Sequence, residues 1–134
     1  MHDKDLQKAL RRYTNEMRAA TDEERRIRNK WRQQIGHQFD SLQATLEASG
    51  LDSHRAVLLA MRKPAPTRDA GMFDYLQYRV ALAYANAVSA LSLLKDNIDP
   101  WFTQGIVELI VVLDNDARCH ADELAEYCSG WWHS

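Results

Sequence analysis

Residues that interrupt regular structure are scarce in this 134-residue chain, which contains only 5 glycines and 3 prolines. Cysteine is scarcer still: Cys119 and Cys128 lie in one predicted helix, about 13 Å apart along its axis at ~1.5 Å per residue, too far to bridge. Free thiols are typical of a reducing compartment, and no Asn-X-Ser/Thr acceptor occurs. We therefore expect a cytoplasmic protein with free thiols. An intermolecular disulfide is the alternative.

Long apolar runs are also lacking. The longest candidate, from Ile106 to Leu113, is interrupted by Glu108, and the first residues, MHDKDLQKALRR, are charged where a signal peptide is apolar. The hydrophobic fraction of 46% and the charged fraction of 27% are typical of a globular protein. We expect a single domain over residues 1–134 that does not associate with membranes.

Motifs for catalysis are missing as well. The chain has no glycine-rich phosphate loop, no Ser/His/Asp arrangement, no paired-cysteine metal signature and no internal repeat. We therefore expect neither an enzyme nor a bound cofactor.

Charge is distributed unevenly, although the net charge is only −2. Residues 1–68 carry 14 basic and 9 acidic side chains, whereas residues 69–134 carry 3 and 10. The two halves are therefore electrostatically complementary, which favours neutralisation within one fold or between copies of the chain. The alternative is that the basic half contacts nucleic acid or that the acidic half contacts a basic partner.

Residues 6–46 show the spacing of a helix with one continuous apolar seam, in steps of four and three. Gly50 is a plausible stop. Thr21 and Glu24 could form a capping box that begins a second helix, but the seam keeps its phase across them, which favours one continuous helix. The seam comprises Leu6, Leu10, Tyr13, Met17, Ala20, Glu24, Ile27, Trp31, Ile35, Phe39, Leu42 and Leu46.

A short helix is expected next, capped by Asp52 or Ser53 and ending near Met61, with Val57, Leu58 and Met61 in the core. A longer helix should begin at Thr67 or Asp69 and run to about Lys95. Its apolar circumference and alanine content predict a central position. The inward positions expected in it are Met72, Phe73, Leu76, Val80, Ala83, Ala87, Leu91 and Leu94.

Asp99 and Pro100 form a good N-cap and first-turn pair for a last helix, and Gly130 should end it. Because residues 96–98 leave so short a connection, the last two helices should form an antiparallel hairpin. The predicted fold is an all-α bundle with a long N-terminal helix, a short connecting helix and this C-terminal hairpin. The inward positions expected in the last helix are Ile106, Leu109, Ile110, Leu113, Ala117, His120, Leu124 and Tyr127.

Helix lengths lead to a hypothesis about association. At ~1.5 Å per residue, hairpin helices of about 27–30 residues span about 40–45 Å, and an unbroken first helix of about 45 residues spans about 65 Å. Residues 1–20 would then protrude and expose an apolar stripe, Leu6, Leu10, Tyr13 and Met17, for oligomerisation. If the helix instead breaks at Thr21, the segment folds back as an extra bundle helix.

Two tryptophans, Trp131 and Trp132, follow Gly130, where chain ends are usually polar. The favoured interpretation is that they fold back to cap the open end of the bundle. The functional alternative is that they anchor a partner, since tryptophan is enriched among interface residues that dominate binding, and a disordered tail is the third.

Two constellations carry weaker hypotheses. Asp116, His120 and Glu123 share a helical face and are weak metal candidates, although a histidine at the core edge bonded to Asp116 is the simpler interpretation. Cys119 beside His120 could suggest an activated thiol, but consecutive helical residues point apart. We expect Cys128 to be a small buried hydrophobic residue.

A basic run surrounds Trp31 and could follow phosphates, with the indole available for stacking. A helix whose cations flank an apolar seam is the better explanation, and the slightly acidic chain makes nucleic-acid binding the secondary hypothesis. The run comprises Arg25, Arg26, Arg28, Lys30 and Arg32.

These patterns predict a small protein-binding helical module, of the adaptor, chaperone-like or regulatory kind, which forms a homodimer through its N-terminal helix. The predicted partner-binding residues are Leu6, Leu10, Tyr13, Met17, Trp131 and Trp132.

Overall fold

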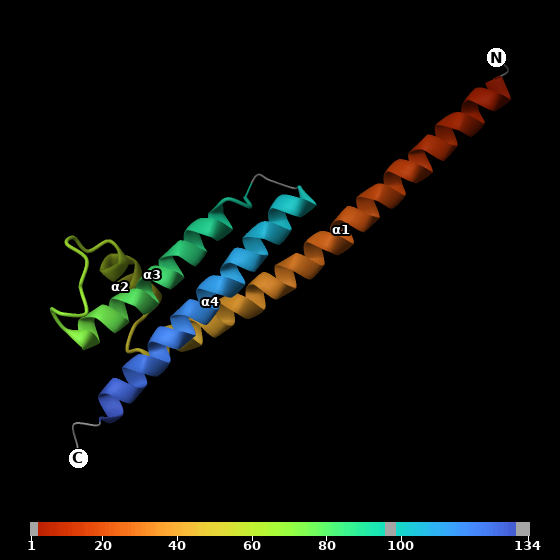
Figure 1. The fold of residues 1–134 in the computed structure, drawn as a ribbon. Helices are drawn as coiled ribbons and strands as arrows, with labels where there is room; N and C mark the ends of the chain where they lie inside the picture. Colours follow the sequence, from red (N-terminus) through yellow and green to blue (C-terminus); the bar gives the residue numbers. More distant parts are fainter. Residues whose placement is uncertain (1–2, 96–98, 131–134) are drawn as a thin grey trace. The chain divides into compact units, whose positions relative to one another are not determined.

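The computed structural model describes residues 3–95 and 99–130, apart from the side chains of residues 17, 19 and 20. Four helices account for the regular structure of these residues: α1 (Asp3–Ala48), α2 (Ser53–Ala60), α3 (Met72–Ser92) and α4 (Pro100–Ser129). No strand occurs within the described ranges. The chain is therefore an all-α protein, as predicted (Figure 1).

The chain divides into two compact units, residues 1–33 and residues 34–134, and the boundary falls within α1. In the first unit, the described residues are helical throughout and show no interruption at Thr21. The capped restart at Thr21 is therefore not adopted. The second unit contains the end of α1 and the other three helices, together with the buried core.

Helix ends follow the capping chemistry of the sequence. The Asp52 carboxylate accepts a hydrogen bond from the Arg55 backbone N–H at 2.7 Å, and α2 begins at the next residue, Ser53. Asp99 likewise accepts from the Trp101 N–H at 3.0 Å, with Pro100 in the first turn of α4. These carboxylates satisfy N–H groups that have no partner within the helix.

The C-terminal stops are glycines, as predicted. Gly50 follows α1 with a φ of +77°, and Gly130 follows α4 with a φ of +66°. This left-handed backbone region is easily reached by glycine alone, because any side chain would be crowded there.

The start of α3 differs from the prediction. Thr67 is followed by a single turn, in which its side chain and carbonyl accept from the N–H groups of Ala70 and Gly71 at 3.3 Å. The helix begins only at Met72, after Gly71, which supplies no side-chain cap. At the other end α3 stops at Ser92, and Lys95 belongs to the turns that follow. Local capping residues therefore initiated a turn rather than the helix.

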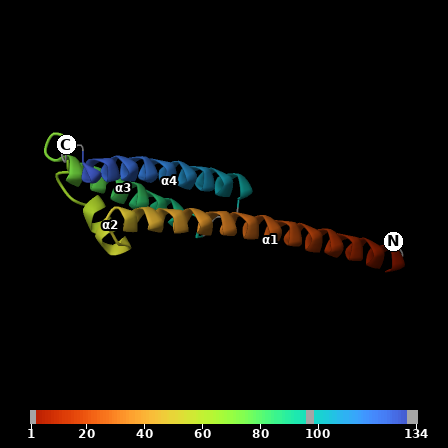
Figure 2. The ribbon, with the colours of Figure 1, turned by 90° about the horizontal axis from the view of Figure 1, so that it is seen from below.

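α3 and α4 form the predicted antiparallel hairpin, and α2 packs against α3 (Figures 1 and 2). The predicted connection at residues 96–98 lies outside the described residues.

The predicted core face of α2 is wrong. Val57, Leu58 and Met61 are exposed, whereas Ala56 is fully buried. At 100° per residue, Ala56 and Ala60 fall on one side of the helix and Val57, Leu58 and Met61 on the other. The small alanines allow the backbone of α2 to approach α3 closely. Leu59 packs against the core, whereas Val57, Leu58 and Met61 face solvent.

The core lies among α3, α4 and residues 34–48 of α1. Its most enclosed large side chains include Leu42, Leu76 and Ile110, and the rings of Phe39 and Tyr84 meet edge to face with centroids 6.4 Å apart. As predicted, α3 is central and close-packed through its alanines. The buried residues of α3 are Leu76, Val80, Ala81, Ala83, Tyr84, Ala87 and Ala90.

Three residues predicted to face the core, Phe73, Leu91 and Leu109, are exposed instead. Val107 and Asp114 of α4 are buried although no inward position was assigned to them. The reason is that α4 is covered from two sides, by α3 and by the part of α1 that contains Ser41, which bonds to Asp114. The buried face of α4 therefore includes residues that the predicted inward positions left out.

Candidate interaction surfaces

The N-terminal stripe lies on one face of α1 and is open to solvent. Leu6, Leu10 and Tyr13 are exposed by 48%, 56% and 62%, and their steps of four and three align them along the helix. The side chain of Met17 lies outside those described. Large apolar side chains in a row on a solvated helix are the usual form of a helix–helix contact face.

The opposite face of the same helical segment is basic. Lys8, Arg11 and Arg12 gather there with Asn15 and Glu16. Residues 1–33 carry ten basic and six acidic side chains, a net charge of +4. The stripe is therefore presented on a cationic helix.

The predicted C-terminal contact residues, Trp131 and Trp132, lie outside the described residues, so both interpretations of this pair remain predictions.

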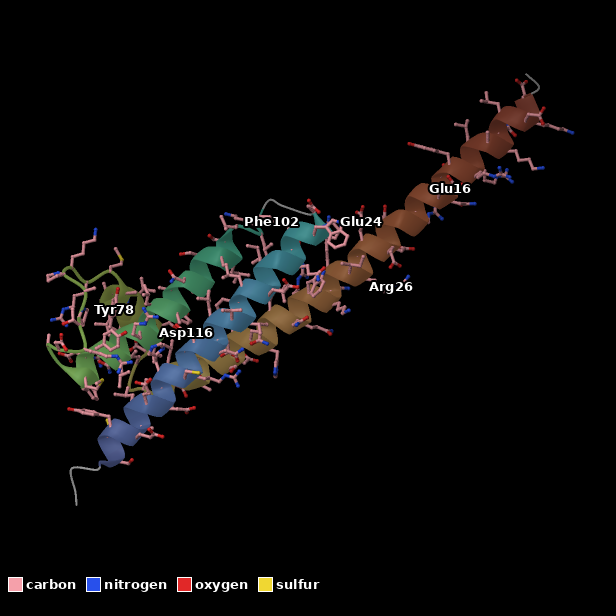
Figure 3. All side chains as sticks on the ribbon, in the orientation of Figure 1. Glu16, Glu24, Arg26, Tyr78, Phe102 and Asp116 are labelled. Carbon is pink, nitrogen blue, oxygen red and sulfur yellow. The ribbon has the colours of Figure 1, made fainter. Side chains whose placement is uncertain are left out.

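The basic run from Arg25 to Arg32 does not form one uniform cationic surface. The guanidinium of Arg26, a residue labelled in Figure 3, lies 3.1 Å from the Glu23 carboxylate, and both side chains of this ion pair are exposed. The Lys30 ammonium lies over the Trp31 ring, 5.5 Å from its centroid. Both contacts are those of a solvated helix with internal pairing.

The weak metal candidates are engaged in other interactions. A ring nitrogen of His120 lies 2.9 Å from the backbone carbonyl of Asp116, the arrangement predicted for a histidine at the core edge. The Asp116 carboxylate is 3.8 Å from the guanidinium of Arg79, and Glu123 is 3.3 Å from that of Arg68. These ion pairs join α4 to α3 and to the loop before it, and no group of three metal-ligating residues occurs in the searched, described part of the chain.

Both cysteines are free and exposed. The prediction that Cys128 is buried is therefore wrong, because the last turn of α4 presents that residue to solvent. Cys119 lines a hollow between α1 and α4, where its thiol is available for cross-linking.

A buried carboxylate links α1 to α4, and sequence patterns did not reveal it. Asp114 is 3% exposed, and the Ser41 hydroxyl lies 2.9 Å and 3.1 Å from its two oxygens. Arg118, one turn further along α4, places its Nε 3.6 Å from the same carboxylate. A buried carboxylate requires such partners, because its charge is otherwise costly to remove from water.

Beside this carboxylate, α1 and α4 enclose an open hollow of about 600 Å³, which we call the α1–α4 hollow. Small side chains make up most of its α1 wall, and its charged residues are Arg118 and Asp122. Such a surface can admit large side chains from another helix. Its lining comprises Ser41, Ala44, Thr45, Ala48, Asn115, Arg118, Cys119, Ala121 and Asp122.

Trp101, at the start of α4, is another residue that sequence reasoning did not single out. It is 81% exposed, although tryptophan seldom remains so open on a folded surface.

No helix among the described residues is long and apolar enough to cross a membrane. Comparison of the chain with models of known protein families, with curated proteins and with solved structures finds no match.

Proposed function

We propose that this protein is a small helical protein-binding module that self-associates through the N-terminal stripe. The observation that carries the proposal is the alignment of three half-exposed apolar side chains, Leu6, Leu10 and Tyr13, on one face of a polar helix.

The energetics support an association role for this segment. The buried core residues of the described chain all fall between Leu42 and Leu124. A helical segment gains most of its stability from packing an apolar face, so covering the stripe would stabilise the helix of residues 3–33. Covering the half-exposed stripe would contribute roughly 1–2 kcal/mol for each side chain.

The test is the mass of the full chain in solution, measured by light scattering over a concentration series. We expect a dimer that dissociates when Leu6 and Leu10 are both replaced by glutamine, a polar residue that preserves helix propensity. The matched control replaces Arg12 by lysine and Asn15 by glutamine, both on the opposite face. It keeps the charge of the segment and should leave the mass unchanged. A wild-type monomer at all concentrations, or a dimer that withstands the stripe substitutions, would refute the proposal.

A further inference from the structure

We infer that the N-terminal stripe binds in the α1–α4 hollow of a second copy of the chain. This inference rests on the self-association proposed above. Three independent observations, of shape, length and charge, lead to it.

The shapes are complementary. The stripe presents Leu6, Leu10 and Tyr13 as protruding side chains, whereas the hollow is an indentation whose α1 wall consists of Ser41, Ala44, Thr45 and Ala48. Helices pack by placing large side chains of one into gaps left by small side chains of the other. A pairing of two stripes would instead oppose large side chains with large ones.

The lengths agree. Leu6 and Tyr13 are seven residues apart, as are Ser41 and Ala48, so each element covers two helical turns, about 10 Å. One hollow can therefore accept all three stripe residues.

The charges favour this pairing over that of two stripes. Residues 1–33 have a net charge of +4, whereas residues 34–134 carry seven basic and thirteen acidic side chains, a net charge of −6. Within the hollow, Arg118 faces the buried Asp114, and Asp122 has no ion pair with the described residues. Docking the cationic segment on the anionic unit of a second copy is attractive, whereas bringing two +4 segments together is repulsive.

The hollow is tested by filling it. Ala44 is exposed, so Ala44→Leu should leave the fold intact while it blocks entry of the stripe. We expect the dissociation constant of the dimer to rise at least roughly tenfold, a change of about 1.4 kcal/mol in the free energy of association. Gln43→Leu adds the same side chain one residue earlier, turned away from the hollow, and should leave the dissociation constant unchanged. Helix content and the unfolding midpoint of both variants verify the fold.

Cross-linking identifies the contact directly. A variant with Ala9→Cys, beside the stripe, and Cys128→Ser keeps only Cys119 in the hollow as its second thiol. A short bismaleimide should join Cys119 to the new thiol between chains and produce a species of about twice the 15.5 kDa chain mass. Asn15→Cys in the same background, on the opposite face, should give no more of this species than the parent with Cys119 alone.

The outcomes separate the two proposals. If the stripe substitutions dissociate the dimer but Ala44→Leu does not, self-association through the stripe is retained and binding of the stripe in the hollow is refuted. Cross-linking confined to single chains would also refute the hollow of a second copy. A monomeric wild type would refute both proposals.

Discussion

Ser41 and Asp114, 73 positions apart in the chain, are joined by a hydroxyl that lies 2.9 Å and 3.1 Å from the two carboxylate oxygens. This contact links α1 to α4 at a buried position. Ser41→Ala removes the hydroxyl and leaves the carboxylate short of a partner, so we expect the free energy of unfolding to fall by about 1–3 kcal/mol. Urea unfolding followed by circular dichroism measures the change.

The control for that experiment is Ser92→Ala, which removes an exposed serine hydroxyl bonded only to the nearby Ser89 carbonyl. It should alter the free energy of unfolding by less than about 0.5 kcal/mol. Equal losses in the two variants would show that the Ser41–Asp114 contact contributes no more to the free energy of unfolding than an exposed hydroxyl does.

Two glycine-to-alanine substitutions should act in opposite directions. Gly105 lies within α4, and a Cβ added there meets nothing within 4 Å, so Gly105→Ala should raise stability by about 1 kcal/mol. Gly50 has a φ of +77°, so Gly50→Ala should lower stability by about 1 kcal/mol even though its nearest neighbour, Gln77 Nε2, is 3.7 Å from the added Cβ. Thermal unfolding of the two variants gives both signs, and a shared sign would contradict the backbone argument.

The Asp52 cap should account for much of the local stability of α2. Asp52→Ala removes the acceptor for the Arg55 N–H, and we expect a loss of about 1 kcal/mol. Asp52→Asn keeps an acceptor in the same place and should lose distinctly less. Hydrogen exchange of the α2 amides reports the effect locally, and equal exchange rates in the two variants would show that the cap is not used.

Close packing of α3 should make Ala87 intolerant of a larger side chain. Ala87 is fully buried, so Ala87→Leu should cost about 1–3 kcal/mol through overpacking. Ala125→Leu makes the same chemical change at an exposed position of α4 and should fall within about 0.5 kcal/mol of the wild type. Denaturant unfolding of both variants tests the difference, and a harmless Ala87→Leu would mean that α3 lies less tightly among its neighbours.

Several helix ends were predictable because their causes are local. The carboxylates of Asp52 and Asp99 reach N–H groups two or three residues onward, and Gly50 and Gly130 adopt backbone angles that other residues avoid. The seam of α1 likewise predicted a continuous helix because its phase depends only on spacing within one segment.

The inward faces were less predictable because burial depends on how closely a neighbour approaches. Spacing assigned Val57, Leu58 and Met61 to the core, but Ala56 and Leu59 are the residues of α2 that contribute to it. An apolar pattern does not distinguish a large side chain that fills a core from a small one that admits another backbone.

The sequence by itself determined the helical class, the caps of α2 and α4 and the exposed-stripe hypothesis, since each follows from chemistry within a few turns of one helix. Only the tertiary structure decided that Asp114 is buried against Ser41 and that small residues of α1 and α4 border a hollow. Those features arise between segments about 70 residues apart, and no local pattern encodes the distance between two helices.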